Sequence, residues 1–168
     1  EEAEILYIKA EPFFKRSLEI KVRTLRLGHP EVATVLHNLA LLYKVQGRYK
    51  KAELNHLKSL AIFEKALGSE HPDVARSLYK LAVFYTDLDR HEEALAYVRR
   101  GSRILRSRFT GVGIEERTGL VAEQRKRSRQ FKAHVDIALS PDLDGERSVL
   151  EAEAFEVLQL ARASGTGR

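Results

Sequence analysis

The 168-residue chain contains no cysteine, no methionine and no tryptophan. Without cysteine it has no disulfide, no thiolate ligand for a metal ion and no cysteine nucleophile. The lack of cysteine suits a reducing compartment, so we expect a cytoplasmic location. Because methionine is absent, we expect Glu1 not to be a translation start and the chain to be a piece of a longer protein.

Long hydrophobic runs are also missing. No stretch reaches 18 consecutive apolar residues, and no basic segment followed by an apolar one opens the sequence. We therefore expect no membrane span. With 43% hydrophobic and 32% charged residues, the composition is that of a folded chain, large enough for one domain or about four helical hairpins.

Patterns typical of enzymes are absent as well. The sequence has no paired catalytic acids, no nucleophile elbow and no phosphate-binding loop, and Gly111-Val-Gly113 lacks the preceding strand that a phosphate loop needs. His134 and Asp136 lie two residues apart on an expected helix and so point to different faces. We expect no catalysis, no cofactor and no metal ion.

A repeat of 42 residues is the strongest pattern present. It places Ala10, Ala52 and Ala94 in register, and the stretch from Gly28 to Gly68 is its one complete copy. A fixed period of this size indicates a stacked array of helical units. Small residues such as Ala40 and Ala52 let two helices approach closely, as an antiparallel hairpin requires.

Apolar residues recur at three and four positions over about seven segments, which predicts an all-α superhelix of antiparallel hairpins. The predicted helices cover residues 2–26, 32–45, 48–67, 74–88, 90–108, 114–139 and 146–163. Gly28 is expected to end the first helix in a left-handed conformation. Pro12 is expected to kink that helix, or a break falls instead near Tyr7. Asp89 stands where Gly47 closes the previous copy.

Two histidines, His29 and His71, recur once per copy just before Pro30 and Pro72. As metal ligands they would lie about 42 residues apart with no second ligand at helical spacing. Proline suits the first turn of a helix, because its missing N–H would have no partner there. We therefore interpret each histidine as part of a helix cap and not as a metal site.

The residues of the complete copy carry a family likeness. The pattern Leu36-x-x-Leu39-Ala40-x-x-Tyr43-x-x-x-Gly47-x-Tyr49-x-x-Ala52 resembles the tetratricopeptide repeat, and its longer unit resembles the repeats of kinesin light chains and their bacterial relatives. Later copies depart from it, with Asp89 and His91 in the second, and Gly101 and Ser102 in the third. The expected organisation is an array over residues 1–109, made of a partial repeat 1–27, a full repeat 28–69 and a degenerate repeat 70–109, followed by a C-terminal helix pair over 110–168.

A second resemblance concerns the C-terminal pair, which we expect to cap the array or to link it to a downstream domain. The run Leu158-x-Leu160-Ala161-Arg162-Ala163-Ser164-Gly165 resembles the segment that joins such repeats to a caspase-like CHAT domain in bacterial proteins. This resemblance implies a bacterial TPR–CHAT parent protein.

The resemblance implies a peptide-binding groove lined by the first helix of each repeat. The expected groove residues are Thr34, His37, Asn38, Leu41, Lys44, Arg76, Tyr79, Lys80, Val83 and Thr86. In kinesin-light-chain-like repeats the position of Asn38 is an asparagine that contacts the backbone of a bound peptide; its equivalent in the next copy is Lys80. The donors of this set favour a ligand with acidic residues, and binding is expected to centre on His37, Asn38 and Lys44. Alternatively, these side chains simply solvate a helix face.

The positive charge is concentrated in residues 94–132, which carry a net charge of +8, against −4 for residues 133–168. The run Arg125-Lys126-Arg127-Ser128-Arg129 spreads around a helix with only Phe131 as an aromatic neighbour, so it lacks the basic face or stacking platform of a nucleic-acid site. We expect it to face solvent or acidic domains of the parent protein, and we expect no nucleic-acid partner.

The sequence thus favours a scaffold that binds a peptide or partner protein in its groove. The alternative is a regulatory or spacer arm that packs on its own downstream domain or self-associates, for example as a homodimer.

Overall fold

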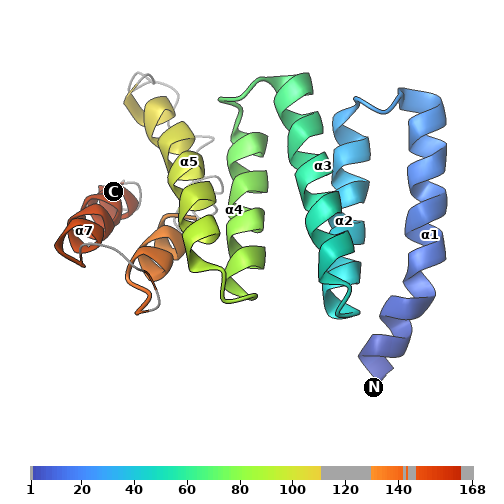
Figure 1. The fold of residues 1–168 in the computed structure, drawn as a ribbon. Helices are drawn as coiled ribbons and strands as arrows, with labels where there is room; N and C mark the ends of the chain where they lie inside the picture. The colour runs from blue at the N-terminus through green and yellow to red at the C-terminus, as the bar shows by residue number, and fades with distance from the viewer. Residues whose placement is uncertain (1, 111–129, 142, 144–146, 164–168) are drawn as a thin grey trace. The chain divides into compact units, whose positions relative to one another are not determined.

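The computed structural model describes the backbone of residues 2–110, 130–141, 143 and 147–163 (Figure 1), and the side chains of 9–107, 130–141, 143 and 148–159. The contacts divide the chain into two compact units, Glu1–Ser77 and Leu78–Arg168. Each unit is described by itself. The predicted domain boundary between residues 109 and 110 is not addressed by this division and stays a prediction.

The first unit contains three helices that lie side by side, each antiparallel to the next (Figure 1). These are α1 (Glu2–Leu25), α2 (Pro30–Val45) and α3 (Tyr49–Leu67). The prediction of one long first helix is confirmed, because α1 contains Pro12 without a break in its helical assignment. The alternative break near Tyr7 is wrong.

The end of α1 differs from the prediction. Arg26, with φ of 68°, takes the left-handed conformation, whereas Gly28 does not have a positive φ. The reason is the repeat itself: Arg26 lies 42 residues before Gly68, which has φ of 86° and ends α3. The left-handed stop is therefore fixed at one place in the repeat, and in the first copy an arginine occupies it.

The hairpin of α2 and α3 is built on small side chains. Ala33, Ala40 and Ala52 are completely buried, which allows the two backbones to approach closely. The hydroxyl of Ser59 on α3 donates a hydrogen bond to the carbonyl oxygen of Ala33 on α2 at 2.7 Å. Gly47 turns the chain between the helices with φ of 69°.

Helix α4 (Pro72–Thr86) begins in the first unit and continues into the second, where α5 (His91–Thr110) follows it. Asp89, with φ of 56°, adopts the left-handed turn conformation of Gly47, which confirms their equivalence. Tyr85 of α4 stacks on Tyr97 of α5, with ring centroids 5.3 Å apart and planes 3° from parallel. The second hairpin thus repeats the turn of the first.

Beyond α5 the described backbone contains a helix over residues 130–138 and α7 (Arg147–Ala163). Their buried residues include Phe131, Ala138, Leu150 and Val157. The predicted helix over 114–139 is confirmed only in its last part, since residues 111–129 lie outside the described chain. The predicted final helix, 146–163, is confirmed within one residue.

Replacing Arg26 with glycine should stabilise the chain. A non-glycine residue in the left-handed region costs on the order of 1 kcal/mol, so Arg26→Gly should raise the free energy of unfolding by about that amount in urea titrations followed by circular dichroism. Gly68→Ala is the matched control and should lower it, because an added Cβ at Gly68 meets no atom within 4 Å and only the backbone strain remains. An unchanged stability in both variants would contradict this account.

Candidate peptide-binding surface

One side of α2 carries the first part of the expected groove. Thr34, Asn38 and Leu41 follow one another at spacings of four and three residues, so they share a face. Thr34 is exposed, Asn38 is half-buried, and Leu41 is 45% exposed although it is a large apolar residue. Lys44, one turn further, is half-buried. Four of the five residues expected on this helix are therefore accessible.

The fifth residue, His37, is a correction to the expected groove. It is only 7% exposed, and its Nδ1 lies 3.2 Å from Nδ1 of His56 on α3, so it packs within the hairpin. The repeat explains the error, because Tyr79 is the equivalent of His37 in the next copy and is half-buried. His37 therefore presents little surface to a ligand, and Asn38 is the middle of the accessible stripe on α2.

The equivalent stripe on α4 lies 42 residues later in the sequence. Arg76 is exposed, and Tyr79, Lys80, Val83 and Thr86 are half-buried. Arg76 forms an ion pair with Asp73 at 2.8 Å, so part of its charge is compensated by its own helix.

The polar residues of the two stripes differ in whether their side chains already form hydrogen bonds. The hydroxyls of Thr34 and Thr86 donate to the carbonyl oxygens four residues earlier, at 3.2 and 3.0 Å, and so keep only acceptor capacity for a ligand. No described residue forms a hydrogen bond with the side-chain amide of Asn38. Asn38 can therefore donate to a ligand carbonyl and accept from a ligand N–H at the same time.

The two histidines before the prolines cap their helices, as predicted. Nδ1 of His29 accepts a hydrogen bond from the backbone N–H of Glu31 at 3.2 Å, and Nδ1 of His71 accepts from the N–H of Asp73 at 3.1 Å. Each ring thus satisfies one of the backbone donors that a helix start leaves open.

A charged junction between α1 and the end of α2 was not predicted from the sequence. Glu11 on α1 accepts hydrogen bonds from the Tyr43 hydroxyl at 3.3 Å and from Arg48 at 2.8 Å, and it pairs with Lys15 at 2.8 Å. The hydrogen bond from Lys15, with Arg48 adding to it, lowers the pKa of Glu11 to about 2 against the opposing effect of burial. The carboxylate therefore remains ionised in its folded position at neutral pH.

Part of this junction recurs in the second unit. The guanidinium carbon of Arg48 lies 4.5 Å from the ring centroid of Tyr43, and that of Arg90 lies 4.5 Å from the ring centroid of Tyr85. The signal was present in the sequence as a tyrosine followed five residues later by an arginine in both copies. Cation–π contact thus fixes the turn after each first helix.

A second polar network joins the last helices of the second unit. Nδ1 of His134 lies 2.9 Å from the Ser102 hydroxyl, and Nε2 lies 2.6 Å from Oε1 of Glu153 on α7. Arg99 on α5 donates to both oxygens of Glu153, with its Nε at 2.8 and 2.9 Å. The elements joined are α5, the helix over 130–138 and α7.

The order serine, histidine, carboxylate is that of a hydrolase triad, but the surroundings are those of a structural network. Ser102 lies inside α5 and is buried, and His134 is buried as well. A nucleophilic serine must reach a substrate carbonyl and have an oxyanion site beside it, and a hydroxyl inside a buried helix face offers neither. The contacts instead brace three helices against one another.

Burial governs the protonation of this network. Desolvation lowers the pKa of His134, although its hydrogen bond to Glu153 opposes the shift. Burial by itself would raise the pKa of Glu153, but hydrogen bonds from Arg99 and His134 lower it overall. At neutral pH the pair is therefore a neutral imidazole that donates to an ionised carboxylate.

Two residues of the basic stretch have acidic partners on α7. Arg99 pairs with Glu153, and Arg106 pairs with Glu156 at 3.2 Å. For these two arginines the acidic partner lies in the same chain. Residues 117–129 of that stretch lie outside the described part, so the expectation for them stays a prediction.

The described helices form hairpins of a repeated unit, which defines the class of helical repeat proteins. The tetratricopeptide repeat family model matches residues 6–65 and 31–107, and the chain belongs to this family. Repeats of this family generally mediate protein–protein interactions. In the described part of the chain, no helix has the length and apolar character needed to cross a bilayer.

Solved structures similar to this chain include kinesin-light-chain-like proteins. The crystal structure of BtubC (BKLC) from P. vanneervenii has a TM-score of 0.73 and 19% identity, over 96% of this chain and 59% of that one. The chain thus spans less than two thirds of that protein. A putative kinesin light chain from Podospora anserina with nearly identical TPR-like repeats has a TM-score of 0.54 and 23% identity, over 95% and 87% of the two chains. No curated protein matches significantly.

Acid should weaken the second unit through His134. Because the pKa of His134 is lowered in the folded state, the unfolded chain takes up a proton first as the pH falls below about 6.5, and stability is lost from there down to the folded pKa. Urea unfolding between pH 7 and pH 5 should therefore show a shallower pH dependence in His134→Gln than in the unchanged chain. Ser102→Ala keeps the imidazole and should retain the steeper dependence; identical slopes for His134→Gln and the unchanged chain would refute this role.

The His37–His56 contact should be replaceable by the residues of the next copy, Tyr79 and Val98. His56→Val alone removes a buried hydrogen-bond partner of His37, so it should lower the free energy of unfolding by roughly 1–3 kcal/mol. Combining it with His37→Tyr should restore part of that loss. A double-variant cycle in urea measures the coupling, and additive effects would show that the two rings do not act as a pair.

Proposed function

We propose that the chain is a non-catalytic interaction scaffold that binds an extended peptide segment on the accessible side of its first helices. The observation that carries the proposal is Asn38: a half-buried amide at the middle of the α2 stripe with no hydrogen-bond partner among the described residues. A half-buried amide that gains partners only from a ligand favours the bound state, because its donor and acceptor are then both satisfied.

The chemistry around Asn38 indicates the class of segment. Lys44 lies on the same helix. Its amine favours a ligand with acidic side chains or a free carboxylate. Leu41, which is 45% exposed, favours an apolar side chain in the same segment. The proposed ligand is an extended peptide that alternates acidic and apolar residues.

Two further properties of the α2 stripe support a binding role over a purely structural one. The stripe on α2 places exposed Leu41 between half-buried Asn38 and Lys44, so one ligand segment can make polar and apolar contacts on the same helix face. The members of the stripe also repeat at corresponding positions of α4, although their identities differ. Such variation at fixed positions suits recognition of a ligand by successive repeats.

Binding is tested with short random peptides displayed against the chain, followed by titration of the enriched peptide. Enrichment of aspartate and glutamate is expected. Asn38→Ala combined with Lys44→Ala on the same helix should weaken the affinity by at least about tenfold, since a hydrogen bond and a charge contact are lost together. Lys58→Ala on α3, which removes an exposed lysine, is the control and should have no effect.

The proposal fails if no peptide is enriched, if the enriched peptides are basic, or if Lys58→Ala weakens binding as much as the double variant does. Asn38→Asp tests the effect of charge on peptide binding alone, because it keeps the size of the side chain and adds a negative charge. It should weaken an acidic peptide more strongly than Asn38→Ala does.

A further inference from the structure

The last turn of α2 presents an apolar residue that the expected groove did not include. Val45 is the final residue of α2 and is 47% exposed, close to the 45% of Leu41 one turn before it. Seven residues make almost two turns of an α-helix, so Val45 lies nearly in line with Asn38. The accessible stripe therefore continues past Leu41 and ends in a second apolar side chain.

Leu41 and Val45 form one contact surface. They are four residues apart, so their side chains are neighbours on the helix, with Cβ atoms about 6 Å apart. A single large apolar side chain from a ligand can touch both. Valine is branched at Cβ and strongly prefers one rotamer in a helix, so its burial costs little side-chain entropy. We call Leu41 and Val45 the apolar pair.

The backbone around Val45 already has partners within the chain. The carbonyl oxygens of residues 42–44 accept hydrogen bonds from the backbone N–H groups of residues 46–48 at 2.8 to 3.1 Å. Gly47 turns the chain there, and the guanidinium of Arg48 lies on the ring of Tyr43. A ligand that reaches this end of α2 therefore meets chiefly the side chain of Val45. Because the turn is fixed before binding, contact with it requires little ordering.

The second copy of the repeat has only half of this apolar pair. Val83 is the equivalent of Leu41, but Asp87 takes the place of Val45 and is exposed. A carboxylate at that position disfavours both an apolar side chain and the acidic residues proposed for the peptide. The apolar pair is thus a property of α2 and distinguishes the two first helices.

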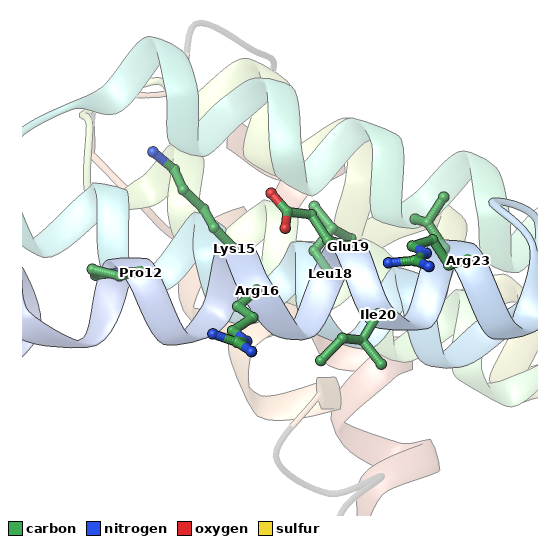
Figure 2. Close-up of a pocket in the computed structure, with 8 residues that line it drawn as sticks. Pro12, Lys15, Arg16, Leu18, Glu19, Ile20 and Arg23 are labelled. Atoms are coloured by element: carbon green, nitrogen blue, oxygen red, sulfur yellow. The ribbon is translucent and has the colours of Figure 1, made fainter.

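A hollow in the first unit lies on a different helix. It has a volume of about 780 Å³, and its lining residues all come from α1, between Pro12 and Arg23 (Figure 2). The apolar pair is therefore a surface contact and not the floor of that hollow. An exposed strip of this kind suits one side chain of an extended segment better than a compact small molecule, which requires a pocket that encloses it.

We propose that the apolar pair holds one large apolar side chain of the bound peptide. This inference rests on the proposed function and adds the residue that selects among peptides. With about 1.5 Å of rise per residue, Val45 lies about 10 Å beyond Asn38 along α2, a distance that an extended segment covers in about three residues. The apolar residue of the peptide therefore lies within about three positions of the backbone group that Asn38 bonds, and Val45 is a specificity-determining residue.

The test uses the octapeptide that the 168-residue chain enriches most strongly from a random library, and a second version in which serine replaces its large apolar residue. The unchanged chain should bind the serine version at least about tenfold more weakly, because the apolar contact is lost. Val45→Thr keeps the branched shape and replaces one methyl group with a hydroxyl, so it should reduce this ratio to about threefold or less. Fluorescence anisotropy with both labelled peptides measures the ratio.

Two further variants separate specificity from general affinity. Asn38→Ala should weaken both peptides by a similar factor and leave their ratio unchanged, because it removes a hydrogen bond to the peptide backbone. Val149→Thr on α7 is the matched control, since Val149 is 54% exposed and undergoes the same substitution. It should change neither the affinities nor their ratio. Circular dichroism verifies that each variant is folded.

Three outcomes would overturn the inference. Acidic peptides enriched without any apolar preference would leave the proposed function standing and remove the apolar contact. A ratio that Val45→Thr does not change would mean that another part of the surface holds the apolar side chain. If the library yields no enriched peptide at all, the proposed function and this inference fall together.

Discussion

The close approach of paired helices is the constraint on which the described fold depends. Where α2 meets α3, alanines occupy the contact and a serine hydroxyl reaches the neighbouring backbone carbonyl. Only small residues permit that distance, so the larger side chains are directed to the flanks, where they fill the core between the helices. The accessible stripe of α2 is what remains on the helix after this packing is satisfied.

Much of the fold could be predicted because the same sequence pattern occurs in two copies of the repeat. Capping by His29 and His71, and the turn at Gly47 and Asp89, each follow from two copies that agree. The residue that ends α1 was predicted wrongly. A positive φ was assigned to Gly28, because glycine adopts it readily, whereas Arg26 adopts it in the structure. The prediction there relied on the preference of Gly28 for a positive φ. The alignment of Arg26 with Gly68 in the repeat gives the correct position.

The candidate site was predictable in outline and not in detail. Periodicity along α2 distinguishes the packed side from the open one to within one residue, and Asn38 lies on the open side as expected. His37 lies at the border, where its burial depends on a partner from α3 that no spacing within α2 reveals. The same limit applies to the network of Ser102, His134 and Glu153, whose members come from three helices separated by 32 and 19 residues.

The buried serine at position 102 affects which helix packs well beside α5. In the complete copy the equivalent position is Leu60, which is buried, whereas Ser102 is buried with its hydroxyl 2.9 Å from Nδ1 of His134. A buried hydroxyl is stabilised by a polar partner, and the helix over 130–138 supplies one through His134. A change from leucine to serine at one position of the repeat thus makes this part of α5 selective for a polar side chain on the neighbouring helix.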